Sequence, residues 1–315
     1  MVQHTSFQNY VSIDLTKKCT NNCIFCVVSG TRNLTQDQKL EDIYNFLLDN
    51  RKKGHTKVNL HGGEPSLYYQ FDKLIDMINE LGYDDITIQT NGWKLENREF
   101  VLALLKKNVK LFVVSFHDSD KDNHNVLTKN TKSFDEVVRG IKNVIELGGN
   151  IRTNTVLVKS NYERIHNIID YLYSINVKTY NISSFNPWWL WIYNKSKLFS
   201  DLSPNYLSMA PYLEKVLNAY KDKDIAITLE GFPYCFLQGY DQFNLYKCKR
   251  DIILLSENNY IINYEEYATK DLRLKRKECE KCIYNPTCGG VWRGYIEYNG
   301  WEEFQPIPSQ ENIPN

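Results

Sequence analysis

The sequence predicts an α/β fold, a partial (β/α)6 barrel of the TIM type followed by a small C-terminal domain. Two observations predict this fold. Over the first 184 residues, strand-like apolar runs alternate with longer segments of helical period, which is the pattern of parallel βαβ units. The alternation then stops in an aromatic loop, and the last third of the chain is rich in cysteine and tyrosine. At 315 residues the chain is long enough for one barrel with an appended domain.

The predicted elements follow one another in chain order. Six strands are expected at residues 11–15, 57–61, 85–89, 110–115, 150–158 and 178–184. Helices are expected between them at residues 36–53, 71–81, 96–107, 134–147 and 162–174. Residues 186–201 are predicted to form the aromatic loop, and a further helix is expected over residues 204–220. We therefore expect the barrel over residues 1–200, the second domain over 201–303 and a flexible tail over 304–315.

The charged residues do not indicate a polyanionic partner. The chain has 38 basic and 38 acidic residues, so we expect it to bind neither nucleic acid nor an anionic membrane. Residues 1–10 lack the basic and apolar regions of a signal peptide, and no run approaches about 20 apolar residues. We expect a cytoplasmic protein in a reducing compartment, where clustered cysteines more often bind metal than form disulfides.

The cysteines fall into an N-terminal and a C-terminal group. Cys19, Cys23 and Cys26 follow the first predicted strand, and the next cysteine is Cys235. Three thiolates can bind three irons of a cubane cluster, which ordinarily takes four, so the fourth iron needs an outside ligand. Zinc is an alternative and would need one more ligand, for which the chain offers His4, His55 or His61. Buried inert thiols are a third interpretation, which the polar residues 20–22 disfavour.

Polar residues also end the other predicted strands, on the side where a parallel barrel builds its reactive face. In chain order these are Gly62, Gly63, Glu64, Thr90, Asn91, Ser115, His117, Arg152, Asn154, Ser183 and Ser184. Turn formation explains any one of these positions. It explains less well why all six strands direct polar residues to the face that carries the cysteine loop.

The sequence Cys19-Thr-Asn-Asn-Cys23-Ile-Phe-Cys26, followed one strand later by Gly62-Gly63-Glu64-Pro65, resembles the radical S-adenosylmethionine (SAM) superfamily. The resemblance covers about residues 11–184. It implies an enzyme with a 4Fe-4S cluster on the three cysteines, whose open iron is chelated by the amino and carboxylate groups of SAM. It also implies that an electron from this cluster cleaves SAM to a 5′-deoxyadenosyl radical, which abstracts a hydrogen atom from the substrate.

The resemblance further implies contacts to SAM. Gly62 and Gly63 allow the backbone to approach a ligand closely, and Glu64 offers its carboxylate to the methionine ammonium. Phe25 matches an aromatic residue whose backbone lies near the adenine. Ser115 matches a serine on strand four that helps to bind the SAM carboxylate or ribose.

Two residues of the fifth predicted strand extend this set. Arg152 and Asn154 resemble the basic residue and the asparagine of the molybdenum-cofactor and peptide-modifying branches of the superfamily. A guanidinium suits a carboxylate because it can donate two parallel hydrogen bonds. The alternative for Arg152 is a surface ion pair. We assign no catalytic role to His117 or His124.

The C-terminal cysteines indicate a second metal centre. Cys279, Cys282 and Cys288, with two and five residues between them, resemble the core of the SPASM and twitch extensions of radical SAM enzymes. The resemblance implies one auxiliary 4Fe-4S cluster, because five cysteines cannot complete two. Its fourth ligand is expected to be Cys235, which follows a strand-like run over residues 231–235, with Cys248 as the competitor. A structural zinc site with four cysteines is the alternative.

The cysteine left over has two interpretations. We assign Cys248 as a catalytic candidate, a hydrogen-atom donor to a substrate radical, as a lone cysteine is in peptide epimerases of this superfamily. The other interpretation is a free thiol without a role. Lysines on both sides of Cys248 favour its thiolate, which suits a metal ligand better than a donor.

The substrate is the least determined feature. Aromatic segments at residues 186–193 and 291–298 can hold a peptide or a small molecule, or can pack the two domains together. The resemblance favours a peptide that is cross-linked, epimerised or joined by a thioether, and implies an external electron donor of the flavodoxin or ferredoxin type. Only 18 residues precede the first cysteine, so we expect a peptide substrate to need either a separate leader-recognition protein or direct binding by the aromatic surface. The alternatives are a small-molecule dehydrogenase or carbon-skeleton enzyme and, more remotely, a non-catalytic binding protein stapled by metal.

Overall fold

The structure is a computed structural model that describes residues 10–28, 36–245, 252–256 and 260–308. Cys248, predicted as a hydrogen-atom donor or as a fourth cluster ligand, lies outside the described residues. All other predicted site residues lie within them.

A nine-stranded sheet organises the described residues, in the order β7-β6-β5-β4-β3-β2-β1-β8-β9. Strands β1 to β8 are parallel to their neighbours, and β9 is antiparallel to β8. The strands are β1 Tyr10–Asp14, β2 Lys57–His61, β3 Asp85–Thr90, β4 Val109–Ser115, β5 Ile151–Leu157, β6 Thr179–Ser184, β7 Ala226–Glu230, β8 Ile252–Leu255 and β9 Ile261–Asn263. The predicted partial barrel is confirmed, and it is extended by β7 beside β6 and by β8 beside β1.

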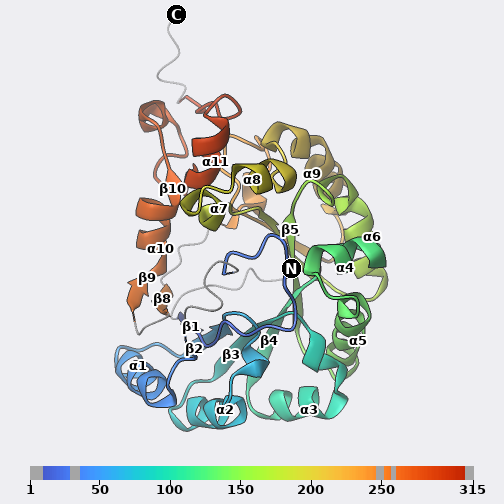
Figure 1. Cartoon of the computed structure of the whole chain (residues 1–315), viewed down its shortest axis with the longest axis vertical. Helices are drawn as coiled ribbons and strands as arrows, with labels where there is room; N and C mark the ends of the chain where they lie inside the picture. Colours follow the sequence, from blue (N-terminus) through green and yellow to red (C-terminus); the bar gives the residue numbers. More distant parts are fainter. Residues whose placement is uncertain (1–9, 29–35, 246–251, 257–259, 309–315) are drawn as a thin grey trace, which may run out of the picture.

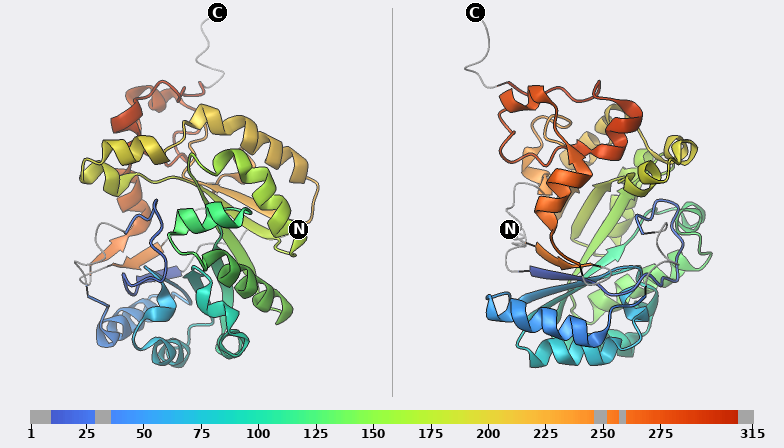
Figure 2. Two further views of the ribbon diagram at one scale, coloured as in Figure 1. Left: turned by 45° about the vertical axis from the view of Figure 1, so that its right-hand side comes forward. Right: turned by 60° about the vertical axis from the view of Figure 1, so that its left-hand side comes forward.

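Helices follow the strands round the outside of the curved sheet (Figures 1 and 2). Those of the first part are α1 Leu40–Lys52, α2 Phe71–Glu80, α3 Arg98–Lys106, α4 Lys121–Thr128, α5 Ser133–Glu146 and α6 Ile165–Ser174. Those of the second part are α7 Trp188–Ile192, α8 Ser196–Leu202, α9 Tyr206–Tyr220, α10 Tyr264–Tyr267 and α11 Arg293–Asn299. The orange and red C-terminal elements lie beside β1 and above α7 and α8 (Figure 1).

The two faces of the sheet have opposite chemistry because strand side chains alternate. Residues that point to the helices are apolar and fully buried, as Val11 and Ile13 of β1 are. Burial of each such side chain contributes roughly 1.5–3 kcal/mol, so this face holds the barrel together. The other face is polar across most of its width. For example, Asn59 of β2 donates to Ser12 Oγ of β1 at 2.7 Å and accepts from Gln89 of β3 at 3.1 Å.

The predicted aromatic loop over residues 186–201 is wrong, because most of it is helical in α7 and α8. Both helices are short, and tertiary packing stabilises them. Phe199 of α8 stacks on Tyr298 of α11 with ring centroids 4.3 Å apart, and Tyr298 Oη donates to the carbonyl of Leu190 at 3.1 Å. The contacts join positions about 100 residues apart, which a local sequence pattern does not reveal.

The C-terminal part packs on the ends of β6 and β7. A two-stranded antiparallel sheet, β10 Arg273–Leu274 and β11 Val291–Trp292, precedes α11. Trp292 donates its indole N–H to Ser184 Oγ at 2.8 Å. Phe304, where the predicted tail starts, is buried, and Ile283 N–H donates to Ile307 O at 2.9 Å, so residues 304–307 pack on the C-terminal part. Residues 309–315 lie outside the described part of the chain.

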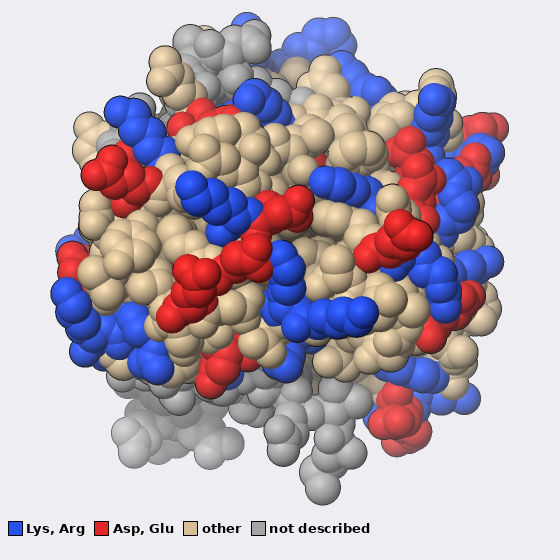
Figure 3. All heavy atoms as spheres, turned by 90° about the horizontal axis from the view of Figure 1, so that it is seen from below, with Lys and Arg blue, Asp and Glu red and all other residues tan. Residues whose placement is uncertain are grey.

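The surface below the sheet carries both signs of charge. Lysine, arginine, aspartate and glutamate side chains are interspersed there without a field of one sign (Figure 3). Several form ion pairs, such as Lys107 with Asp76 at 2.6 Å and Arg98 with Glu146 at 2.7 Å. Among the described residues, we find no helix with the length and apolar character needed to cross a bilayer.

Candidate active site

The cysteine loop follows β1 and lies against the C-terminal end of α4. The backbone N–H groups of Asn22 and Ile24 donate to the carbonyls of the last two residues of α4, at 2.9 and 3.0 Å. A turn closes between the later cysteines, where Cys26 N–H donates to Cys23 O at 3.2 Å. Cys19 and its two partners are each partly exposed. These backbone hydrogen bonds thus hold the loop, and Cys23 also packs against the hydrophobic core.

Gly62 and Gly63 press the end of β2 against the stem of this loop. Gly63 N–H donates to Thr16 O at 2.6 Å, and Glu64 N–H donates to Lys18 O at 2.7 Å. Gly62 has φ +135°, and a Cβ there would lie 2.5 Å from Thr16 O. A Cβ on Gly63 would clash with Lys18 O. The sequence predicts a close approach of the backbone to a ligand at these glycines. In the structure, the glycines closely approach the backbone of residues 16–18 of the same chain.

Glu64 joins the ends of β2 and β3. Its carboxylate is completely buried and accepts from Thr90 Oγ1 at 2.8 and 2.9 Å, Asn91 N at 2.8 Å and Ser66 Oγ at 2.6 Å. Burial raises the pKa of the carboxyl, and these hydrogen bonds oppose that rise. Protein donors surround the group in this structure, so the expected contact to a SAM ammonium stays a prediction.

Asn91 links this carboxylate to the first cysteine. Its side-chain amide donates to Thr20 Oγ1 at 2.8 Å and lies 3.5 Å from Cys19 Sγ. Its Oδ1 accepts from Trp93 N at 3.1 Å, which fixes the orientation of the amide. Hydrogen bonds to cysteine sulfurs are one of the features that set the properties of an iron–sulfur centre. The end of β3 therefore positions the cysteine loop.

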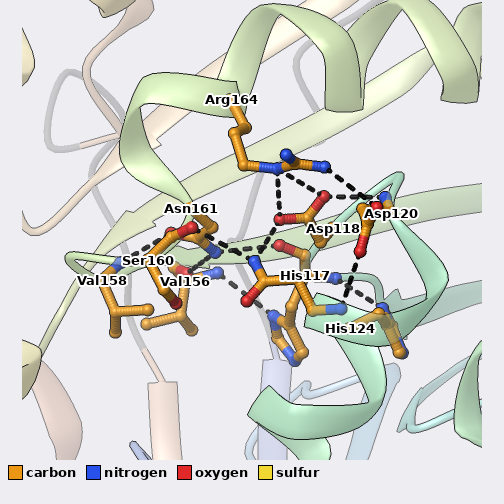
Figure 4. A network of polar contacts seen from close by, with 10 residues as sticks. His117, Asp118, Asp120, His124, Val156, Val158, Ser160, Asn161 and Arg164 are labelled. Atoms are coloured by element: carbon orange, nitrogen blue, oxygen red, sulfur yellow. Dashed lines mark hydrogen bonds and ion pairs between the residues drawn. The ribbon is translucent and has the colours of Figure 1, made fainter.

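Phe25 packs on His117, one of two buried histidines that lie together. Its ring meets His117 edge-on, with centroids 4.6 Å apart. His117 Nδ1 accepts from Val156 N at 3.4 Å, and His117 N donates to His124 Nδ1 at 3.4 Å (Figure 4). Burial lowers the pKa of His117 to about 3 and that of His124 to about 4, so both imidazoles are neutral at pH 7.

An ion pair between the completely buried Asp118 and the partly exposed Arg164 holds the backbone next to these histidines. Arg164 Nε donates to both carboxylate oxygens of Asp118 at 3.0 Å, and Asn161 Nδ2 donates to His117 O at 2.9 Å (Figure 4). The histidines and this ion pair connect β4, α4 and the start of α6. The network therefore supports the wall of the site against which Phe25 lies.

Ser115, Arg152 and Asn154 lie on the polar face of the sheet. Ser115 of β4 is paired in register with Asn154 of β5. Arg152 lies deeper and is only 7% exposed, which excludes the surface ion pair considered for it. Its Nη2 donates to Asn181 Oδ1 at 3.1 Å and to Thr228 Oγ1 at 3.0 Å. The structure thus brings the three predicted residues together, and their contacts to SAM stay a prediction.

Three residues on this face were missed by sequence reasoning. Asn181 Nδ2 donates to Asn154 Oδ1 at 2.7 Å and to Glu230 Oε2 at 2.8 Å, while Thr228 Oγ1 donates to Asn181 Oδ1 at 2.8 Å. The signal was available, because these residues repeat the spacing of Arg152 and Asn154: polar residues two apart in a strand share one face.

The four C-terminal cysteines within the described residues line one cavity, and all four are unbridged thiols. Cys235, Cys279, Cys282 and Cys288 share it with the apolar side chains of Leu274, Val291 and Phe304. Burial, and then the neighbouring thiols, raise the pKa of Cys235 to about 12. Residues 231–235 are not a strand as predicted, because β7 ends at Glu230 and Cys235 lies in the turn that follows.

The two sets of thiols suit different centres. Three thiols on one anchored loop suit a cluster that keeps one open iron, and four around one cavity suit a fully ligated cluster. Within the described part of the chain, no three His, Cys, Asp or Glu side chains converge on one metal ion. That observation applies to a site for a single ion. It does not apply to a cubane cluster, in which each thiolate binds a different iron.

A comparison with protein families identifies this arrangement. The profile of the Radical SAM superfamily matches residues 13–172, which is half of the chain and runs from β1 into α6. The chain belongs to the radical SAM superfamily. The family implies a 4Fe-4S cluster and SAM, and the region matched contains the cysteine loop, the glycines after β2 and the polar residues of β4 and β5.

Curated relatives match only part of this radical SAM enzyme. A probable GTP 3′,8-cyclase of Saccharolobus solfataricus is 28% identical over 176 residues, 56% of each chain. The GTP 3′,8-cyclase of Aquifex aeolicus is 32% identical over 152 residues, 47% of each chain. The chain therefore spans about half the length of the curated relatives it matches.

Two solved structures match nearly the whole chain. SuiB of Streptococcus suis, bound to the precursor peptide SuiA, superimposes with a TM-score of 0.66 at 18% identity and covers 97% of this chain and 76% of its own. The structure of anSMEcpe with bound AdoMet gives a TM-score of 0.57 at 16% identity, covering 94% and 89%. At such identities the likeness establishes the fold, including its C-terminal part.

Proposed function

We propose that this radical SAM enzyme modifies a peptide and holds an auxiliary 4Fe-4S cluster in its C-terminal part. The observation that carries the proposal is the cavity lined by Cys235, Cys279, Cys282 and Cys288. It supports a twitch-like cluster with Cys235 as the fourth ligand. The peptide is supported by the likeness to SuiB, which spans 97% of this chain and whose structure holds a precursor peptide.

The roles of the residues follow from their positions. When bound, the cluster and SAM supply a 5′-deoxyadenosyl radical that abstracts a hydrogen atom. Cys19, Cys23 and Cys26 would hold three irons of that cluster. Ser115 and Asn154 would donate to SAM from the polar face, and the buried Glu64 carboxylate joins the ends of β2 and β3 beside the cysteine loop.

The division of the chain and its partners belong to the same proposal. Residues 1–200 would carry the SAM-binding site and residues 201–303 the auxiliary site, with β7 and β8 completing the sheet of the first part. A flavodoxin or ferredoxin would supply the electron, and a separate protein would recognise a leader peptide. A reducing cytoplasm suits centres that depend on free thiolates.

A nucleotide is the second candidate substrate. The observation that favours it is the name GTP 3′,8-cyclase on relatives that are 28–32% identical over about half of the chain. The two candidates are separated by anaerobic turnover with SAM and reductant. GTP and synthetic versions of the peptides that are encoded beside the gene are each supplied as the substrate, and the masses of the products are measured. A changed peptide mass with unchanged GTP supports the proposal, and the reverse result replaces it.

The auxiliary cluster is tested by removing one thiol at a time. The reconstituted wild type is expected to hold about eight irons per chain, four per cluster. We expect Cys235→Ala to lose up to about four of them and Cys248→Ala to keep all eight. If Cys248→Ala retains its iron and SAM cleavage but loses product, Cys248 is the hydrogen-atom donor. If zinc accompanies only about four irons in the wild type, the second centre is a zinc site.

A further inference from the structure

Asn91 follows β3 and brings an amide group to the first cysteine of the loop. Its Nδ2 lies 3.5 Å from Cys19 Sγ and donates to Thr20 Oγ1 at 2.8 Å. A cysteine sulfur can accept a hydrogen bond, and the nitrogen–sulfur distance is longer than a nitrogen–oxygen distance because sulfur is the larger atom. The end of β3 therefore places an N–H donor on a sulfur that is expected to bind iron.

Two further contacts fix the orientation of this amide. The backbone N–H of Asn91 donates to Glu64 Oε2 at 2.8 Å, and its Oδ1 accepts from Trp93 N at 3.1 Å. Because Trp93 uses the oxygen of the amide, the nitrogen with its two hydrogens faces the cysteine loop. Those two hydrogens match the two acceptors, one oxygen and one sulfur. The fold thus holds a donor in the orientation that stabilises negative charge on the sulfur.

Such a donor acts differently on the two oxidation states of a cluster. A hydrogen bond to an ionised acceptor strengthens as the negative charge on the acceptor increases. One-electron reduction of a 4Fe-4S cluster increases the negative charge that its thiolates share, so the donor stabilises the reduced state more than the oxidised state. Hydrogen bonds to the sulfurs are among the features that set the potential of an iron–sulfur cluster. A donor on Cys19 therefore raises that potential.

We propose that the side-chain amide of Asn91 raises the reduction potential of the cluster on Cys19, Cys23 and Cys26, through its hydrogen bond to Cys19 Sγ. The amide acts on a cluster ligand and does not touch the substrate. This inference rests on the proposed binding of the cluster by the cysteine loop. It adds a residue that sets how readily the cluster accepts an electron.

Asn130 provides a matched control, because it holds the cysteine loop through contacts of the same type. Its Oδ1 accepts from Lys132 N at 3.0 Å, and its Nδ2 donates to Asn21 Oδ1 at 2.8 Å. Asn91 and Asn130 thus share a local turn and an amide contact to the loop. Within the described part of the chain, the sulfur contact is made by Asn91 and not by Asn130.

The test measures the midpoint potential of the reconstituted protein by electron paramagnetic resonance during stepwise reduction, using the signal that changes when SAM is added. In Asn91→Ser, the hydroxyl still accepts from Trp93 N but is too short to reach Cys19. We expect this variant to lower the equilibrium constant for one-electron reduction about tenfold, a fall of about 59 mV in the potential. Thr20→Val, which removes the other acceptor of the amide, and Asn130→Ser are each expected to change the constant less than about twofold.

Three results would overturn the inference. The first is an Asn91→Ser variant that binds its iron and keeps the wild-type potential. The second is a control variant whose potential falls as far as that of Asn91→Ser, because the position of the loop would then set the potential. The third is an Asn91→Ser variant that does not bind iron on the loop, since the side chain would then hold the loop itself. Failure of the proposed function is distinguishable, because the wild type would then lack a signal that responds to SAM.

Discussion

At the scale of single residues, glycine at position 62 determines how closely the end of β2 approaches the cysteine loop. Two effects of a side chain there can be separated. One is the strain of φ +135°, and the other is the contact of a Cβ with Thr16 O at 2.5 Å. Gly54 provides the comparison, because its φ is +94° and no atom lies within 4 Å of its Cβ position.

We expect Gly54→Ala to lower the free energy of unfolding by roughly 1 kcal/mol, the usual cost of a left-handed residue. Gly62→Ala is expected to cost roughly 2–4 kcal/mol, because backbone on both sides must shift. It should also lower the iron bound at Cys19, Cys23 and Cys26. Urea unfolding and iron analysis after anaerobic reconstitution measure both effects. Equal costs at the two positions would mean that the loop adapts and that the glycine is needed only for its φ.

At the scale of elements, His117 and His124 connect β4 to α4 and to the cysteine loop that α4 supports (Figure 4). Burial lowers the pKa of His124 to about 4, below the ordinary value of about 6.5. The unfolded chain therefore binds a proton between these values that the folded chain does not. This contribution of His124 to the free energy of unfolding is complete above pH 6.5 and is lost as the pH falls.

His124→Gln is expected to remove part of this acid sensitivity. Between pH 8 and pH 5.5, the wild type should lose roughly 1 kcal/mol more unfolding free energy than the variant. Urea unfolding at a series of pH values measures the difference. If the His124 variant is as acid-sensitive as the wild type, other groups carry the pH dependence.

The elements also show what the sequence can predict. Each of the six predicted strands agrees with the structure to within one residue at either end. Their apolar alternation is local, and residues such as Val58 and Leu60 are fully buried as the pattern indicates. Helices α7 and α8 were missed because they are short and are stabilised by distant rings such as Tyr298.

The prediction of the site from the sequence has the same limit, because it includes local patterns and misses contacts between distant segments. The cysteine spacing and the glycines after β2 are local patterns, so the sequence contains them completely. Asn181 bridges Asn154 and Glu230 because of the register of β5, β6 and β7. This register is set by pairing between distant segments of the chain. The position of Cys235 beside Cys279, Cys282 and Cys288 likewise depends on the C-terminal packing that forms the cavity.

At the scale of the whole molecule, residues 230–235 connect the two sites. This segment runs from Glu230 on the polar face to Cys235 in the four-thiol cavity, and Gly231 fixes its direction. The carbonyl of Gly231 accepts from Ser184 Oγ at 2.8 Å and from Tyr206 Oη at 3.1 Å. The end of β6 and the start of α9 thus hold the turn that aims Cys235 at the other cysteines.

Gly231→Ala should therefore disturb the four-thiol cavity more than the cysteine loop after β1. Gly231 has φ +79°, and a Cβ there would clash with Ser184 Oγ and lie 2.8 Å from Trp292 Nε1. We expect the variant to lose up to about four irons per chain while it still forms 5′-deoxyadenosine from SAM. Gly239→Ala is the control, because its φ is +85° but no atom lies within 4 Å of its Cβ position. If both variants keep their iron, residues 231–235 adapt without moving Cys235, and the two sites are less tightly connected than the packing indicates.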